Sequence, residues 1–264
     1  MGKVFQTKKP KKPKSDTFPL KNGQSYARSS RSILGRILHV IITLIVVIAV
    51  VVGGFYVKFQ LEVSSTQASM KEYLQNKYKR EFVIEKPEYK GGGLAVEGGW
   101  VANANRKGSS NKFLVLEKGS SYRDNYLNAL YNEREMNSLY RVIDTLGIKD
   151  YKYMVDISID PKVADNTEGT PALSDMLSQY GADITYGVYV IKTGNLPNQK
   201  DVENLKILVE YVKSKNPSHY AVRYVINSRT DNSRYLCHYH GGTGDNTNIK
   251  NLSVDCFTKY EGKE

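Results

Sequence analysis

The chain has 264 residues, enough for one or two domains, and a net charge of +11. Residues 1–58 hold 11 Lys and Arg residues against one acid, whereas residues 59–264 hold 27 Lys and Arg residues against 26 acids. The excess charge therefore belongs to the N-terminal segment. Because a nucleic-acid-binding domain carries its basic surface on the folded part, this distribution argues against nucleic acid as a partner of the folded domain.

Residues 1–36 are rich in Lys, Pro and Ser and show no apolar periodicity. This composition predicts a disordered basic tail. We expect the tail to lie in the cytoplasm, against anionic lipid head groups. A docking peptide or a nucleic-acid-binding tail is the alternative interpretation.

Residues 37–57 form an apolar stretch without a charged residue. A helix of this length spans roughly 31 Å, close to the thickness of a bilayer's hydrocarbon core. The basic segment before it and the apolar stretch itself are both longer than in an ordinary signal peptide, which favours an uncleaved anchor. Arg28, Arg31 and Arg36 precede the stretch, so the positive-inside rule places the N-terminus in the cytoplasm and residues 58–264 outside.

The first half of the outer domain begins with a helix over residues 61–80, where Met70, Leu74 and Tyr78 recur at helical spacing. Strands are predicted over residues 82–85, 94–104 and 112–117. A longer helix is predicted over residues 124–146, with Asp124 in its first turn and Gly147 just past its end. Its buried stripe is expected to comprise Leu127, Leu130, Met136, Leu139, Tyr140, Ile143 and Leu146.

The second half alternates between strands and helices. Apolar and polar residues alternate strictly over residues 151–160, which indicates a strand with one wet face. Further strands are predicted over 184–192 and 220–226, and helices over 172–180 and 201–215. A final hairpin is predicted from residues 235–240 and 252–258.

Together these elements predict an α+β fold: a transmembrane helix, then a domain with a mixed or antiparallel sheet, three to five helices and a C-terminal hairpin. The domain is expected to be one unit over residues 58–264, or two subdomains over about 61–147 and 148–264.

Four segments carry a resemblance. They are YLQNKYKREFVIEKPEY from Tyr73, GGWVANANRK from Gly98, KFLVLEKG from Lys112 and DNYLNALYNEREM from Asp124. Over residues 70–145 the chain resembles uncharacterised single-pass surface proteins of Gram-positive-type and related bacteria. In that group a membrane anchor leads into a helix–strand segment and then a second helix. The resemblance implies a surface location and no activity.

Two cysteines, Cys237 and Cys256, follow the membrane stretch, and His238 and His240 adjoin the first. If both cysteines lie on strands of the hairpin, they point to its apolar face and the histidines to the other, so four ligands could not surround one metal ion. In an oxidising compartment a disulfide is then the expected outcome. Two free thiols and a metal site are the alternatives.

The sequence predicts no catalytic, metal or cofactor site. It contains no nucleophile elbow, zinc-protease motif or phosphate-binding loop, and His219 is expected on the solvent face of a strand. Residues 241–246 do not match a calcium loop, and Asp156, Asp160 and Asp165 show no other mark of a hydrolytic site.

The abundance of Tyr, 20 residues against one Trp, is a hint of an interface or of a half-exposed sheet. The leading hypothesis is a membrane-anchored binding module of the cell envelope. It would contact the bilayer through residues 37–57 and an envelope protein or ligand through the outer domain. The alternatives are an envelope hydrolase or wall-modifying enzyme, and a bitopic subunit of a secretion or DNA-transfer apparatus.

Overall fold

The computed structural model describes residues 27–91, 98–242 and 249–260. Most of the predicted tail, residues 1–26, and most of the loop after Gly242 lie outside these ranges. The chain divides into two compact units, Met1–Lys58 and Phe59–Glu264. The second unit contains both sheets of the protein.

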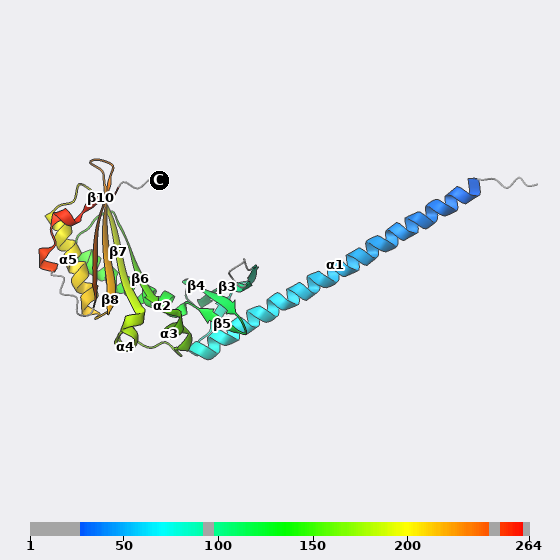
Figure 1. Cartoon of the computed structure of the whole chain (residues 1–264), viewed down its shortest axis with the longest axis horizontal. Coiled ribbons are helices and arrows are strands. Elements are labelled where there is room, and N and C mark those ends of the chain that lie inside the picture. The colour runs from blue at the N-terminus through cyan, green and yellow to red at the C-terminus, as the bar shows by residue number, and fades with distance from the viewer. Residues whose placement is uncertain (1–26, 92–97, 243–248, 261–264) are drawn as a thin grey trace, which may run out of the picture. The chain divides into compact units, whose positions relative to one another are not determined.

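The described residues form an α+β fold, as the sequence predicts (Figure 1). The α-helices are α1 Ala27–Tyr78, α2 Tyr126–Thr145, α3 Pro161–Asn166, α4 Leu173–Tyr180 and α5 Gln199–Ser214. The strands are β1 Phe82–Ile84, β2 Glu88–Lys90, β3 Gly99–Arg106, β4 Lys112–Lys118, β5 Ser121–Asp124, β6 Tyr151–Ile159, β7 Ile184–Gly194, β8 His219–Ser228, β9 Arg234–Gly242 and β10 Thr258–Tyr260. Short 3₁₀ turns are η1 Gly181–Asp183, η2 Ile249–Asn251 and η3 Val254–Cys256.

Helix α1 contains the predicted membrane stretch. Among the described residues it is the one helix that is long and apolar enough to cross a membrane. The side chains of residues 37–57 are exposed along this helix, as a bilayer-facing surface requires. The predicted second helix is the C-terminal part of α1, and Met70, Leu74 and Tyr78 are buried there as expected.

The first sheet consists of β1 to β5 and is wholly antiparallel. Its strand order is β1-β3-β4-β5, and β2 pairs with the start of β3. The alternation of Phe113 and Val115 with Leu114 along β4 buries one face of this sheet and exposes the other.

The second sheet has the order β10-β9-β8-β7-β6. Strands β7 and β8 are parallel and the other pairs are antiparallel. A parallel pair needs a crossover, which α5 supplies alongside the strands (Figure 1). Asn198 and Asp201 form a capping box at the start of α5. The buried Asp201 carboxylate also pairs with Lys192 of β7, which ties the helix to the sheet.

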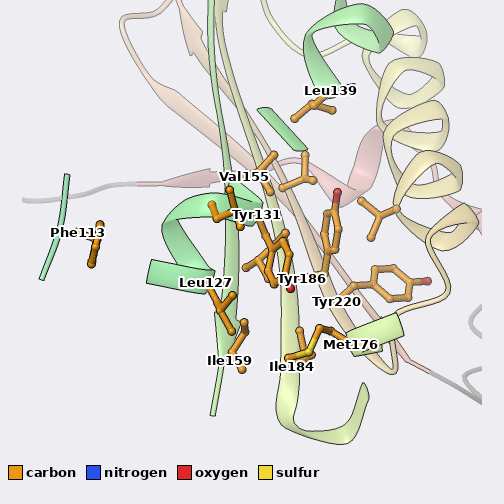
Figure 2. Close-up of a cluster of buried hydrophobic side chains, with 14 of the residues drawn as sticks. Phe113, Leu127, Tyr131, Leu139, Val155, Ile159, Met176, Ile184, Tyr186 and Tyr220 are labelled. Carbon is orange, nitrogen blue, oxygen red and sulfur yellow. The ribbon is translucent and has the colours of Figure 1, made fainter. Parts of the chain in front are cut away.

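One hydrophobic cluster joins the two sheets. Helix α2 contacts β4 of the first sheet and β6 of the second, and its buried residues include Leu127, Tyr131 and Leu139 (Figure 2). Asn132 and Met136 of α2 cover the outer edge of β6: the Asn132 Oδ1 accepts from the Ile157 amide at 2.6 Å, and the Met136 sulfur from the Val155 amide at 3.3 Å. The helix therefore shields an edge strand from pairing with another chain.

The C-terminal pair of antiparallel strands is confirmed as β9 and β10, but the predicted bounds of the second strand, 252–258, are wrong. That segment forms η3 and a turn before it, and pairing begins only at Thr258. Tyr140 was expected in the buried stripe of α2, yet it is 49% exposed. Strands β2 and β5 and helix α3 were not predicted, because they are too short to show a period.

Candidate functional site

The open face of the second sheet is the side that α5 does not cover. On β6 to β9, alternate residues such as Val188, Val222 and Tyr224 are buried toward α5, and the residues between them point the other way. Four of these outward residues lie in register across four strands: Met154, Tyr189, Arg223 and His238. We call this set the Arg223 row.

Arg223 contacts two other members of the row, Tyr189 and His238. The guanidinium carbon of Arg223 lies 5.1 Å from the centre of the Tyr189 ring, a cation–π distance. The Arg223 Nε donates to the Nε2 of His238 at 3.2 Å. The ring centres of His238 and His240 are 3.6 Å apart. Cross-strand pairing thus produces a continuous polar and aromatic strip.

His238 is held neutral within this strip. Desolvation, followed by the neighbouring His240 and Arg223, lowers its pKa from 6.5 to about 4. At neutral pH the ring therefore carries no charge, and its Nε2 can accept the hydrogen bond from Arg223. The charge of Arg223 is not cancelled by either contact.

Gly187 lets the Tyr189 ring lie close to the strand. A side-chain carbon at residue 187 would stand 3.0 Å from the Cε2 of Tyr189 and 3.1 Å from the Asp156 carbonyl oxygen. Apolar side chains surround the row: Met154 is 51% exposed and Ile191 is 37% exposed, while Val225 and Leu236 are half-buried. Aromatic, methionine and arginine side chains together are typical of protein interfaces.

The open face is positively charged. Lys152, Arg223 and Arg234 are exposed, and Asp156 is the one acid at the outward positions of β6 to β9. Arg234 donates to the Asn227 side chain at 3.2 Å. Within the described part of the chain, neither arginine forms an ion pair with a carboxylate.

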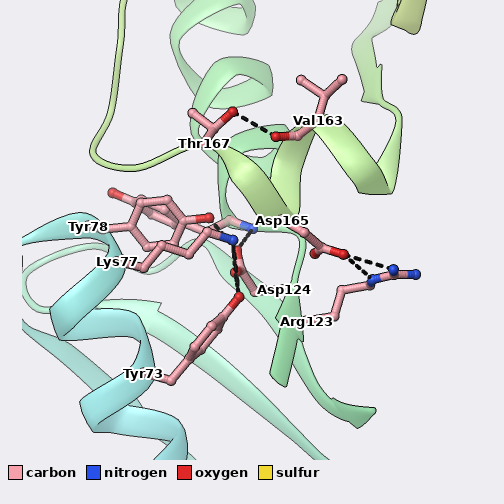
Figure 3. A network of polar contacts seen from close by, with 9 residues as sticks. Tyr73, Lys77, Tyr78, Arg123, Asp124, Val163, Asp165 and Thr167 are labelled. Carbon is pink, nitrogen blue, oxygen red and sulfur yellow. Dashed lines mark hydrogen bonds and ion pairs between the residues drawn. The ribbon is translucent and has the colours of Figure 1, made fainter. Parts of the chain in front are cut away.

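A second polar cluster joins the end of α1 to the first sheet (Figure 3). The buried Asp124 carboxylate accepts from Lys77 at 2.9 Å, Tyr73 at 2.9 Å, Tyr78 at 2.7 Å and the Tyr126 amide at 2.9 Å. Because an ionised carboxylate has about four lone-pair positions, all of them are satisfied. Asp124 was expected in the first turn of the long helix, but it ends β5 instead. This cluster holds the structure together and offers no free group for chemistry.

The structure brings the sulfur atoms of Cys237 and Cys256 to disulfide distance, with 5.2 Å between the Cα atoms. Cys237 lies on β9 as expected, but Cys256 lies in η3 and not on a strand. The prediction that Cys256 lies on a strand is therefore wrong, whereas the predicted pairing with Cys237 matches the geometry.

The other residues singled out in the sequence do not converge. His219 begins β8 and is exposed, as expected. Asp160 caps α3 by accepting from the Lys162 amide at 2.7 Å, and Asp165 pairs with Arg123 at 2.8 Å. No group of three or more possible metal ligands occurs in residues 27–91, 98–242 and 249–260. Most of the segment 241–246 lies outside the described residues.

The Arg223 row was not predicted from the sequence. Arg223 and His238 could each be recognised as a polar residue of a predicted strand, but their alignment across the sheet depends on the strand order and register. The abundance of Tyr reflects an interface or a half-exposed sheet only in part, because many tyrosines are buried, and Tyr186 and Tyr224 lie in the core.

No protein-family model and no curated protein matches the sequence. One solved structure, a crystal structure of a DUF5037 family protein from Ruminococcus gnavus, is similar to this chain with a TM-score of 0.41 and 15% sequence identity. The match covers 70% of this chain and 96% of that one.

Proposed function

We propose that the protein is a membrane-anchored binding module of the cell envelope, and that the open face of its second sheet docks an acidic segment of a partner protein. The anchor is the apolar part of α1, and the arginines before it favour a cytoplasmic N-terminus. The resemblance to single-pass surface proteins supports the same location.

The observation that carries the proposal is the uncompensated charge of the Arg223 row. Arg223 contacts an aromatic ring and a neutral imidazole, so its guanidinium remains available for a carboxylate. Met154 and Ile191 add apolar area beside it. An acidic segment with apolar side chains would match both the charge and the exposed carbon surface.

The hydrolase alternative has less support. A general base of the Ser-His-Asp type needs a histidine oriented by an acid. His238 instead accepts a hydrogen bond from Arg223, and desolvation, followed by His240 and Arg223, lowers its pKa. Esterase, glycosidase and peptidase substrates offered to the full-length protein test this alternative directly.

Photo-cross-linking in native membranes tests the docking proposal. The probe residue p-benzoylphenylalanine replaces Ile191 on the open face, and in a matched control it replaces Ile207, which is 44% exposed on α5. We expect an adduct from Ile191→p-benzoylphenylalanine that contains an acidic peptide of another protein. The adduct should disappear when Arg223→Glu is added.

Several outcomes would overturn this proposal. They are an equal adduct yield from the Ile207 control, an adduct that survives Arg223→Glu, and an adduct with lipid, glycan or a second copy of the chain. Co-purification with and without residues 1–36 distinguishes a secretion or DNA-transfer subunit from a module that acts through its outer domain alone.

A further inference from the structure

A cavity of about 370 Å³ opens at a different place in the second unit. It is lined by α2, by the start of α4 and by the end of α5. Its lining residues include Tyr131, Arg134, Glu135, Leu173, Leu177 and Lys215. This volume lies within the range of small-molecule sites.

The inner wall of the cavity is built around the buried carboxylate of Glu135. It accepts from the hydroxyl of Tyr186 at 2.6 Å and from that of Tyr211 at 3.0 Å, and it pairs with the Lys215 ammonium at 3.1 Å. Burial, then the carboxylate itself, raises the pKa of both phenols, so both remain donors at neutral pH. The wall is therefore fixed and close to neutral, because Lys215 offsets Glu135.

The rim carries a cation without a partner. Arg134 is exposed beside Glu135, and within the described ranges its guanidinium makes no hydrogen bond or ion pair. Among the lining residues, Arg134 and Lys215 together outweigh Glu135 by one positive charge, and Asp175 lies near Tyr131 but outside the lining. The remaining wall is mixed. Leu177 and Tyr131 are buried and Leu173 is half-buried, which gives an apolar part, and Ser174 and Ser214 add hydroxyl groups. A ligand that fits must combine one negative charge with an apolar body.

We propose that this cavity binds a small free organic acid, whose carboxylate pairs with Arg134 and whose hydrocarbon part packs on Leu173, Leu177 and the Tyr131 ring. A guanidinium can hold a carboxylate through two parallel hydrogen bonds. The burial of the apolar part distinguishes such a ligand from a small inorganic anion. The cavity and the open face are formed by different helices and strands. The experiments can therefore reject one of the two proposals without rejecting the other.

Calorimetry on the full-length protein in nanodiscs tests this inference with three probes: hydrocinnamate, its uncharged amide hydrocinnamamide, and inorganic phosphate. We expect hydrocinnamate to bind and the other two to bind at least roughly tenfold more weakly, as the loss of a charged hydrogen bond implies. Arg134→Gln should weaken hydrocinnamate binding by a similar factor.

The matched control is Arg141→Gln, which removes another exposed arginine of α2 that does not line the cavity. Its affinity should equal that of the unmodified protein. The inference is overturned if hydrocinnamate does not bind, if the amide or phosphate binds as tightly, or if Arg134→Gln and Arg141→Gln have equal effects. The amide comparison uses the unmodified protein, so it decides the question even if Arg134→Gln lowers stability.

Discussion

The two sheets differ in the partners of their exposed Lys and Arg side chains. At the first sheet two exposed cations are paired with acids: Lys112 contacts Glu85, and Lys107 contacts Glu81 at 2.6 Å. Lys90 and Lys118 are also exposed on this sheet and form no ion pair among the described residues. On the second sheet Arg223 and Arg234 contact only neutral partners. Both faces are open and both carry apolar residues, so exposure alone does not distinguish them.

This difference identifies which face suits a charged partner. A face whose charges are already paired gains little Coulomb energy when an acidic segment approaches. A guanidinium stacked on an aromatic ring is held in place and still lacks a carboxylate. The interior follows the reverse pattern, because each buried acid among the described residues has a cationic partner: Asp124 with Lys77, Glu135 with Lys215 and Asp201 with Lys192.

The largest expected effect comes from breaking the buried pair of the first sheet. Lys77→Met keeps most of the side-chain length and removes the charge that compensates Asp124. An uncompensated buried carboxylate should cost about 3–5 kcal/mol of the free energy of unfolding. Urea unfolding of the full-length protein in detergent, followed by the fluorescence of the lone Trp100, which is buried in this sheet, measures the loss.

Lys107→Met is the control for Lys77→Met, because it breaks an ion pair whose two side chains are 70% and 65% exposed. Its unfolding curve should nearly overlay that of the unmodified protein. If Lys77→Met were equally silent, the buried cluster would not hold α1 to the first sheet.

The next effect concerns the edge of the second sheet, where Cys237 and Cys256 are separated by 19 residues in sequence. A bond that closes such a loop restricts the unfolded chain by about 3 kcal/mol in the entropy model. We therefore expect Cys237→Ser to lower the melting temperature by several degrees.

Protein taken from native membranes without reductant should have both cysteines blocked to alkylation, as read by mass spectrometry. Two freely alkylated thiols would contradict the disulfide. In that case reductant would leave the melting temperature of the unmodified protein unchanged.

A smaller effect should appear in the pH dependence of the stability, and it tests the neutral state of His238 on the open face of the second sheet. His238 titrates near pH 4 in the folded protein and near 6.5 when unfolded. Between these values the unfolded state binds more protons, so stability falls as the pH drops from 6.5 toward 4 and then stops falling. Desolvation is the largest cause of the lowered pKa, followed by the neighbouring His240 of β9 and Arg223 of β8.

His238→Gln removes this titration and should flatten the fall in stability over the same pH range. Melting temperatures of both proteins at a series of pH values give the difference. Parallel curves would show that the pKa of His238 is not lowered in the folded protein, and the availability of Arg223 would then need another explanation.

The sequence predicted the fold class well because burial leaves periodic marks. The alternation over residues 151–160 became β6 Tyr151–Ile159, and the helix predicted over residues 201–215 became α5 Gln199–Ser214. Elements of three to six residues, such as β2 and α3, show no period and were missed. The Arg223 row could not be foreseen, because Tyr189 and Arg223 meet only through a parallel pairing that α5 makes possible.

The smallest effect is expected at an exposed ion pair beside the second sheet. Arg229 donates to Asp150 at 2.6 Å, and both side chains are 63% exposed. A single pair in this setting gains little over hydration, so Arg229→Gln should change the free energy of unfolding by less than about 1 kcal/mol.

The same substitution should leave the Ile191 cross-link intact, because Arg229 lies in the turn after β8 and not on the open face. If Arg229→Gln reduced the cross-link as strongly as Arg223→Glu, the overall positive charge near the second sheet would explain docking. The difference between the two sheets would then not account for it. If only Arg223 matters, docking depends on a cation fixed between Tyr189 and His238.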